Sequence, residues 1–215
     1  VVVIIGGTGS GKSSLVSLIP HFYDVKDGRV SVFGKNVCAY DDEDLRHRIG
    51  YVQQKAVLFQ GTVRSNLLWG DDSASDDDLR TALSTAQVLD IVADKGGLDA
   101  PVEQNGANFS GGQKQRLSVA RALVRKPQIL VLDDSSSALD YATEAAMRKA
   151  ILALPYKPTL FIVSQRASSV MCADRILVLE DGRLVGDGTH KALLANCPAY
   201  CEIYHSQFSE EVTDA

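Results

Sequence analysis

The stretch Val1-Val2-Val3-Ile4-Ile5-Gly6-Gly7-Thr8-Gly9-Ser10-Gly11-Lys12-Ser13 opens the sequence and decides the fold. The run Val1–Ile5 is β-branched and apolar throughout, which predicts a strand buried in a parallel sheet. Residues Gly6–Ser13 then match the pattern Gly-x4-Gly-Lys-Ser/Thr without a gap. A helix is predicted over Lys12–Ile19, so the glycine-rich loop leads from a strand into a helix. In this setting the pattern binds phosphate groups.

Each part of this loop has a chemical task. Glycines let the backbone turn tightly, so that its N–H groups point at a phosphate, and the helix start adds the positive end of its dipole. We expect Lys12 to reach the β- and γ-phosphates of a nucleotide and the Ser13 hydroxyl to bind Mg²⁺. The other residues expected to touch phosphate are Gly6, Gly7, Thr8, Gly9, Ser10, Gly11 and Ser14. The alternative, a glycine-rich turn without a ligand, is disfavoured by the Lys12-Ser13 pair.

A second strand, Ile129–Leu132, is predicted to supply the carboxylate that such a loop requires. It is apolar and leads into Asp133, and ligands of open α/β sheets bind at the carboxyl ends of the strands. We therefore expect Asp133 to hold Mg²⁺ through a water molecule. Many buried strands end in aspartate, so this motif is informative only together with the phosphate loop.

Outward from these two strands, the chain alternates strands with helical stretches, which predicts an α/β fold with a mostly parallel sheet. Further strands are expected at Arg29–Phe33, Thr159–Ser164 and Ile176–Glu180. The middle of the chain differs, because helical stretches are separated there by Gly and Asp clusters. The predicted division is a first core part (1–60), a helical subdomain (61–112), a second core part (113–208) and a flexible tail (209–215).

The composition excludes several classes of protein. Hydrophobic residues make up 45% and charged residues 23% of the 215 residues, as in globular domains. A net charge of −5 without any Lys/Arg run disfavours nucleic acid as a partner. No apolar run approaches the ~20 residues that span a bilayer, and the chain starts in a strand without a methionine, so we expect an excised part of a larger protein. The cysteines are interpreted as structural or incidental thiols in a reducing compartment: Cys38, Cys172, Cys197 and Cys201.

The pentapeptide Phe109-Ser110-Gly111-Gly112-Gln113 connects the sequence to a known family. It resembles the signature of ATP-binding-cassette (ABC) proteins, usually Leu-Ser-Gly-Gly-Gln, and the strand ending at Asp133 follows at the family's interval. The Ser-x-x-Gln spacing also fits a capping box, so Ser110 is expected to begin a helix that runs to about Val124. The resemblance covers nearly the whole chain.

Other segments resemble further motifs of the same family. Gln54 stands where the family has a glutamine that binds Mg²⁺ and senses the γ-phosphate, and Ser137-Ala138-Leu139-Asp140 resembles the D-loop, which implies that Asp140 contributes to the nucleotide site. Two segments are similar to exporter cassettes: Leu58–Val63, near the coupling helices of a membrane domain, and Val102–Gly106, just before the signature. Trp69 is interpreted as core of the helical subdomain or as a contact with that membrane domain, in preference to a nucleotide contact.

The resemblance implies a P-loop NTPase of RecA-like fold with an inserted α-helical subdomain, from which the family's N-terminal antiparallel β-region is apparently missing. It implies ATP and Mg²⁺ as ligands. Ser110, Gly111, Gly112 and Gln113 then face the γ-phosphate that a second nucleotide-binding domain holds in a head-to-tail dimer. ATP closes such a dimer and hydrolysis loosens it, which drives transport, with export expected, through the coupling helices of a transmembrane domain. The expected location is the cytoplasmic face of the cell membrane.

Two positions depart from the family's pattern, and both concern hydrolysis. The family's general base after Asp133 is glutamate, whereas this chain has Asp134, whose carboxylate falls roughly 1–1.5 Å short. The family's switch histidine is replaced by Gln165, within Ile162–Arg166, and an amide cannot relay a proton. This resembles the degenerate half of heterodimeric exporters, in which one Walker site hydrolyses slowly and the partner's site is competent.

Three alternatives stay open. The first is a homodimer in which Asp134 is a slow but adequate base. The second is an ATP-binding regulatory module without turnover. The third is a soluble ABC ATPase, which is disfavoured because the chain has neither a long coiled-coil insertion nor tandem cassettes, and because it has the exporter-like segment Val102–Gly106.

Overall fold

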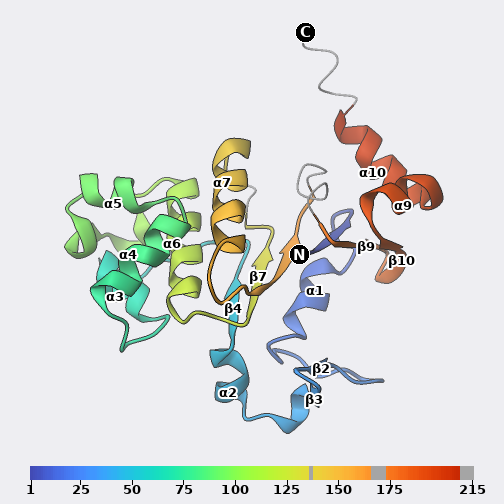
Figure 1. Ribbon diagram of the computed structural model, residues 1–215, viewed down its shortest axis with the longest axis horizontal. Helices are drawn as coiled ribbons and strands as arrows, with labels where there is room; N and C mark the ends of the chain where they lie inside the picture. The colour runs from blue at the N-terminus through green and yellow to red at the C-terminus, as the bar shows by residue number, and fades with distance from the viewer. Residues whose placement is uncertain (136–137, 166–172, 209–215) are drawn as a thin grey trace. The chain divides into compact units, whose positions relative to one another are not determined.

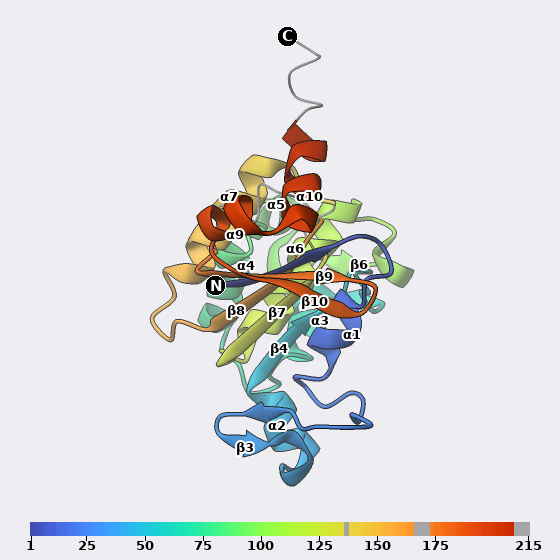
Figure 2. The same ribbon diagram turned by 90° about the vertical axis from the view of Figure 1, so that its right-hand side faces the viewer.

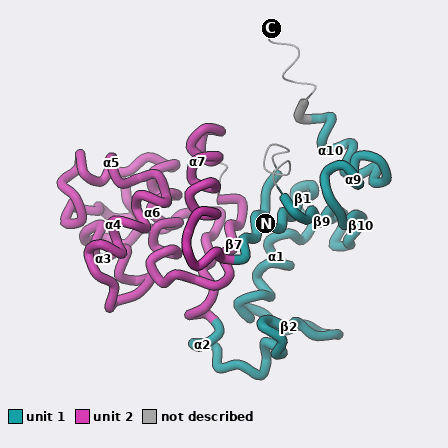
Figure 3. Tube along the Cα trace, in the orientation of Figure 1, with its two compact units in different colours: residues 1–45, 159–215 teal, residues 46–158 magenta. Residues whose placement is uncertain are grey.

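The computed structural model describes residues 1–135, 138–165 and 173–208 (Figure 1). Two compact units divide the chain: unit 1 consists of Val1–Leu45 and Thr159–Ala215, and unit 2 consists of Arg46–Pro158 (Figure 3). Each unit combines helices with parallel strands, as predicted for an α/β fold. The boundaries predicted at residues 60 and 112 were placed by sequence motifs, whereas the two units are defined by compactness. The predicted division therefore stays a prediction.

The sheet of unit 1 has the order β10–β9–β1–β8. Its strands are β1 (Val2–Gly6), β8 (Thr159–Val163), β9 (Arg175–Glu180) and β10 (Arg183–Gly188). β1 runs parallel to both neighbours, with Ile4 opposite Val163 on one side and Leu177 on the other. Its central position explains its unbroken apolar sequence, since Val3, Ile4 and Ile5 are at most 1% exposed.

A tight hairpin joins β9 to β10. Its turn residues Asp181 and Gly182 have φ values of 46° and 74°, the left-handed conformation that Asp-Gly favours in a two-residue hairpin loop. Helices α9 (His190–Asn196) and α10 (Pro198–Phe208) pack against this hairpin (Figure 2). Tyr200 is fully buried there, and burial raises the pKa of its hydroxyl to about 12.

The remaining elements of unit 1 follow the phosphate loop. They are α1 (Lys12–Ser17), β2 (Ser31–Val32), β3 (Lys35–Asn36), the 3₁₀ turn η1 (Val37–Ala39) and the start of α2 (Asp42–His47). β2 and β3 pair as a small antiparallel hairpin. The strand predicted over Arg29–Phe33 is therefore shorter than expected, because Phe33 adopts a left-handed φ of 52° and ends it.

Unit 2 contains the helical part of the chain. Its strands are β4 (Ile49–Val52), β5 (Gly61–Thr62), β6 (Pro101–Val102) and β7 (Ile129–Asp133), with β4 and β7 parallel. Its helices are α3 (Val63–Leu68), α4 (Asp76–Thr85), α5 (Leu89–Asp94), α6 (Gly111–Val124) and α7 (Tyr141–Leu152), with 3₁₀ turns η2 (Gly97–Asp99) and η3 (Gln104–Gly106). The helical stretches predicted for this region are confirmed.

The packing of these helices follows from local sequence signals. α3 and α4 both lie against α6 (Figure 1). Leu67 of α3 and Leu79 and Leu83 of α4 are at most 1% exposed. Thr62, Ser75 and Ser110 each begin a helix with a reciprocal capping box. Within the described ranges, no helix has both the length and the apolar character that a membrane span requires.

Candidate nucleotide-binding site

The predicted phosphate loop forms the turn from β1 to α1. Gly6 has a φ of 156°, and a Cβ there would lie 2.1 Å from the carbonyl oxygen of Leu179, so only glycine fits. Gly11, with a φ of 92°, precedes the helix start at Lys12. The backbone thus reverses directly at the carboxyl end of a buried strand, and the first N–H groups of α1 lie at that end of the sheet.

The side chain of Lys12 is turned into the loop. Its Nζ donates to the carbonyl oxygens of Gly6 at 2.9 Å and Gly7 at 2.7 Å, and to Ser10 Oγ at 3.3 Å. The residue is only 7% exposed. A buried ammonium needs such acceptors, and phosphate oxygens would offer it stronger, charged ones. Ser13 is an exposed residue in the first turn of the same helix, directly after Lys12.

Gln165 lies at the same edge of the sheet in unit 1. Val163 of β8 is opposite Ile4 of β1, so that Gln165 and Gly6 both lie two residues beyond a paired position. The backbone N–H of Ser164 continues the pairing by donating to the carbonyl oxygen of Ile4 at 3.1 Å. The strands therefore bring the switch position to the edge that carries the phosphate loop. Arg166 lies outside the described residues.

Unit 2 carries the predicted metal-binding carboxylate at the end of β7. Asp133 is 6% exposed and accepts a hydrogen bond from the Tyr51 hydroxyl at 2.9 Å. Tyr51 belongs to β4 and is opposite Val131, two residues before Asp133. Two residues along a strand return to the same face of a sheet, so the tyrosine can orient the carboxylate. The role of Tyr51 was not predicted from the sequence, although its place in a strand next to Gln53-Gln54 was a usable signal.

Gln54 and Asp134 meet directly. The Gln54 side-chain amide donates to Asp134 Oδ2 at 2.9 Å. Val52 is opposite Leu132 in the β4–β7 pairing, so each partner lies two residues beyond a paired position. Asp134 has a left-handed φ of 46°, a conformation that aspartate adopts more readily than most residues.

The signature segment begins α6 as predicted. Ser110 Oγ accepts from the N–H of Gln113 at 3.3 Å, and Gln113 Oε1 accepts from the N–H of Ser110 at 3.0 Å. Two residues further, the buried Gln115 donates to the carbonyl oxygen of Gln53 at 3.1 Å and fixes the backbone beside Gln54. This contact of Gln115 was not predicted from the sequence, although a glutamine on the mostly apolar, buried face of a helix indicates such a contact.

The D-loop residue Asp140 caps helix α7. Its two carboxylate oxygens accept from the N–H and the hydroxyl of Thr143, each at 2.8 Å, and these hydrogen bonds lower the pKa of Asp140. The preceding Ala138 lies against the signature, since a Cβ on Gly112 would be 2.9 Å from its carbonyl oxygen. Ser137 of this motif lies outside the described residues.

Each unit carries a buried parallel strand that leads into groups suited to one part of a metal-bound nucleotide. In unit 1, β1 leads into an ammonium and N–H groups, which suit phosphate. In unit 2, β7 ends in a buried carboxylate, which suits a divalent cation. A family model described as ABC transporter matches residues 1–137, which include both of these strands. The chain belongs to the ABC transporter family.

Individual relatives extend the match beyond those residues. YfiB of Bacillus subtilis (strain 168), an uncharacterized ABC transporter ATP-binding protein, is 46% identical to the cassette over 215 residues, which are 100% of this chain and 37% of that protein. A putative multidrug export ATP-binding/permease protein of Staphylococcus aureus (strain NCTC 8325 / PS 47) is 41% identical over 96% of this chain and 36% of its own. The cassette therefore spans just over a third of these relatives' length.

A solved structure confirms the predicted fold. The structure of a bacterial Atm1-family ABC exporter with ATP bound superposes with a TM-score of 0.91 and 36% identity, over 96% of this chain and 37% of that one. Together with the family match, this confirms the prediction of an exporter-type ABC nucleotide-binding domain with a P-loop NTPase fold.

Proposed function

We propose that this cassette binds MgATP, closes head-to-tail on a second cassette and powers export through a membrane domain, while its own Walker site hydrolyses ATP slowly. In this proposal Lys12 and the loop N–H groups hold the phosphates, and Ser13, Gln54 and Asp133 hold Mg²⁺. The metal neutralises charge on the phosphates. The capped start of α6 at Ser110 offers N–H groups to the γ-phosphate held by the partner.

The contact between Gln54 and Asp134 carries the proposal of slow hydrolysis. A general base needs an oxygen within about 3 Å of the attacking water. The Asp134 side chain is one methylene shorter than the glutamate usual in the family, and its Oδ2 accepts the Gln54 amide at 2.9 Å. Gln165 can donate a hydrogen bond but cannot relay a proton. Both departures fall on groups that act at the γ-phosphate, whereas the binding residues are kept.

The signature supports a competent site in the partner. Ser110 and Gln113 form the complete capping box, and Phe109, the one departure from the usual pentapeptide, is 4% exposed and serves the core of the helical part. A cassette with a weak base and a complete signature fits a heterodimer, in which this chain's signature completes the partner's hydrolysing site.

An aromatic surface supports docking of a membrane domain. Trp69 is 66% exposed and stacks on the half-exposed Phe59, with ring centroids 4.9 Å apart. Trp69 also lines a cavity of about 490 Å³ with His47, Leu68 and Asp71. The interpretation of Trp69 as subdomain core is therefore wrong, and its exposure favours the alternative, a contact with coupling helices of the membrane domain.

The test measures ATP hydrolysis by the complete transporter when only this cassette's site can turn over, because the phosphate-loop lysine of the second cassette is replaced by alanine. We expect little turnover from the wild type and a rise of roughly 10²-fold in the double variant Asp134→Glu/Gln165→His. Lys12→Ala, which removes the phosphate ligand, gives the baseline. The left-handed φ of 46° at position 134 is unfavourable for glutamate. Thermal unfolding midpoints are therefore compared, to establish that the double variant folds like the wild type.

Brisk turnover by the wild type that Asp134→Asn abolishes would instead make Asp134 a working base and overturn the slow-site proposal. A regulatory module without turnover is the second candidate, because Asp134 and Gln165 weaken the same step. A regulatory module should bind MgATP tightly. The unaltered transporter, with both of its nucleotide sites intact, should then hydrolyse ATP only at the baseline rate.

A further inference from the structure

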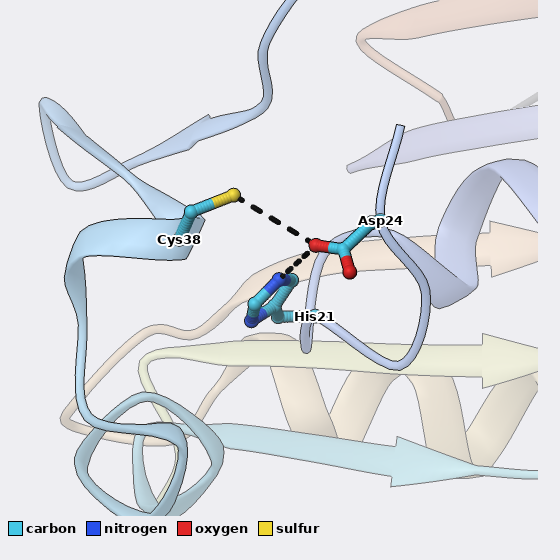
Figure 4. A group of neighbouring side chains, drawn as sticks. All are labelled: His21, Asp24 and Cys38. Atoms are coloured by element: carbon cyan, nitrogen blue, oxygen red, sulfur yellow. Dashed lines mark hydrogen bonds and ion pairs between the residues drawn. The ribbon is translucent and has the colours of Figure 1, made fainter. Parts of the chain in front are cut away.

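A cluster of metal-binding side chains lies in unit 1, on segments that the phosphate loop does not use. It consists of His21 and Asp24 in the turn after α1 and Cys38 in η1 (Figure 4). Asp24 Oδ1 lies 2.9 Å from His21 Nε2 and 4.0 Å from Cys38 Sγ. The ligand atoms of the three residues all lie within 4.8 Å of one another.

We propose that His21 Nε2, the Asp24 carboxylate and Cys38 Sγ bind a zinc ion or a divalent transition metal of similar preference. An imidazole, a thiolate and a carboxylate together form a donor set for zinc, whereas Mg²⁺ and Ca²⁺ prefer oxygen atoms alone. Among the described residues, this is the only such group of three or more.

The distances need little adjustment to fit a tetrahedral ion. Zinc–ligand bonds of about 2.0–2.3 Å place a nitrogen and an oxygen ligand about 3.4 Å apart, and an oxygen and a sulfur ligand about 3.6 Å apart. The corresponding distances are 2.9 Å and 4.0 Å, so each pair changes by about half an ångström. Asp24 and Cys38 are exposed and free to make that movement, while the His21 side chain is only 18% exposed.

A further carboxylate orients the imidazole from its other side. Asp42 Oδ1 lies 3.0 Å from His21 Nδ1. Metal-binding histidines usually donate their second N–H to a carboxylate, which fixes the tautomer and leaves the other nitrogen for the metal. Asp42 is therefore assigned as a positioning residue that keeps the Nε2 lone pair directed at the cluster.

The backbone holds these segments in place. His21 has a left-handed φ of 54°, which persists only where surrounding contacts determine it. Its N–H donates to Leu18 at 3.2 Å, and the N–H of Phe22 donates to Ser17 at 3.1 Å. Cys38 is held through its own N–H, which donates to Asn36 Oδ1 at 3.2 Å. The metal would tie the turn after α1 to η1, with a fourth position left for water or another ligand.

The proposal gives Cys38 a role other than that of a structural or incidental thiol, because this cysteine is exposed and lies beside a histidine and a carboxylate. A hydrogen-bonded network without metal is the rival explanation. Such a network accounts for the contacts of His21 with Asp24 and Asp42 and for the long contact of the Cys38 thiol with Asp24 at 4.0 Å, but exposed ion pairs contribute little stability.

The test is a Co²⁺ titration of the full-length protein, without nucleotide and under reducing conditions. Co²⁺ substitutes for zinc, and a thiolate ligand produces a charge-transfer absorption band that oxygen and nitrogen ligands do not. We expect one equivalent of Co²⁺ to produce this band in the wild type. Cys38→Ser should abolish it, His21→Gln and Asp24→Asn should weaken binding strongly, and added Zn²⁺ should displace the cobalt.

Two further variants test whether Co²⁺ binds at this cluster and not at another thiol. Cys201→Ser, which removes a thiol at α10 and not at the cluster, should leave the band unchanged. Asp42→Asn should keep the band but weaken Co²⁺ binding about 10- to 100-fold. No band in the wild type, or an equal band in Cys38→Ser, overturns the proposal.

Thermal unfolding gives an independent readout. A metal that binds only the folded state stabilises it by mass action. Zn²⁺ should therefore raise the unfolding midpoint of the wild type and of Cys201→Ser, but not that of Cys38→Ser. An equal rise in all three proteins would show that zinc acts elsewhere and would contradict the proposal.

Discussion

Gln54 donates its side-chain amide to the carboxylate of Asp134 at 2.9 Å, although 80 positions separate the two residues in the sequence. The parallel pairing of β4 with β7 causes this contact, because Val52 lies opposite Leu132 and both chains then continue for two residues. The proposed metal ligand Gln54 and the proposed general base Asp134 are thus joined within unit 2. A substitution at Gln54 should therefore alter the role of Asp134 in hydrolysis, and a substitution at Asp134 should alter the role of Gln54.

Replacing Gln54 by alanine should raise the Mg²⁺ concentration needed for half-maximal ATP hydrolysis roughly tenfold, since it removes both a proposed ligand and the partner of Asp134. Nucleotide binding in the absence of Mg²⁺ should not change. Gln53→Ala is the matched control, because Gln115 contacts only the backbone carbonyl at that position. An unchanged Mg²⁺ dependence in Gln54→Ala would remove Gln54 from the metal site.

Lys12→Ala should weaken ATP binding by roughly 10–100-fold, because a charged hydrogen bond to phosphate contributes about 1.5–3 kcal/mol. Lys12→Arg should weaken ATP binding almost as much. Gly6, Gly7 and Ser10 surround a compact ammonium on a residue that is 7% exposed, and a guanidinium is larger. Binding of a fluorescent ATP analogue measures both, with the exposed Lys26→Ala as control. Wild-type affinity in Lys12→Ala would contradict the assigned phosphate site.

The sequence predicted those parts of the site that depend on neighbouring residues. The apolar run Val1–Ile5 and the glycines after it determine a strand and a loop locally, and the Ser110–Gln113 spacing determines a helix start. The helices and the parallel strands were predictable for the same reason.

Contacts between distant segments were not predictable in this way. The Tyr51–Asp133 and Gln115–Gln53 hydrogen bonds require the register of two strands and the position of a helix above them. The His21 cluster likewise joins a turn to η1, which no spacing in the sequence indicates. A one-dimensional pattern identifies which chemistry is present, but strand register decides which side chains meet.

Ser110 and Ser75 offer a comparison between a structural and a functional cap. Each begins a helix of unit 2 with a capping box, so Ser110→Ala and Ser75→Ala should each cost about 1 kcal/mol of stability. Only Ser110→Ala should also lower hydrolysis at the partner's site, because only Ser110 belongs to the signature. Unfolding midpoints and dimer turnover, measured together, separate the effects. Equal losses of turnover in both variants would reduce Ser110 to a structural cap.

Gly111 and Gly112 differ in what surrounds them, although both lie in the first turn of α6. A Cβ on Gly112 would lie 2.9 Å from the carbonyl oxygen of Ala138 and 3.4 Å from Leu139 Cδ2, whereas a Cβ on Gly111 would lie 3.9 Å from the Ala138 Cβ. Alanine should raise helix propensity at either position by a similar amount. The difference between the two variants therefore isolates the contact between the signature and the D-loop.

We expect Gly111→Ala to leave the unfolding midpoint unchanged or slightly raised, and Gly112→Ala to lower it. The new Cβ of Gly112→Ala would clash with the carbonyl oxygen of Ala138. Because this oxygen belongs to the backbone, it cannot rotate away, and the D-loop itself must shift. Asp140, two residues further along, caps α7 through Thr143, and a shifted D-loop should strain that cap and reduce turnover in the dimer. Identical midpoints and identical turnover in the two variants would mean that the signature and the D-loop do not depend on this close packing.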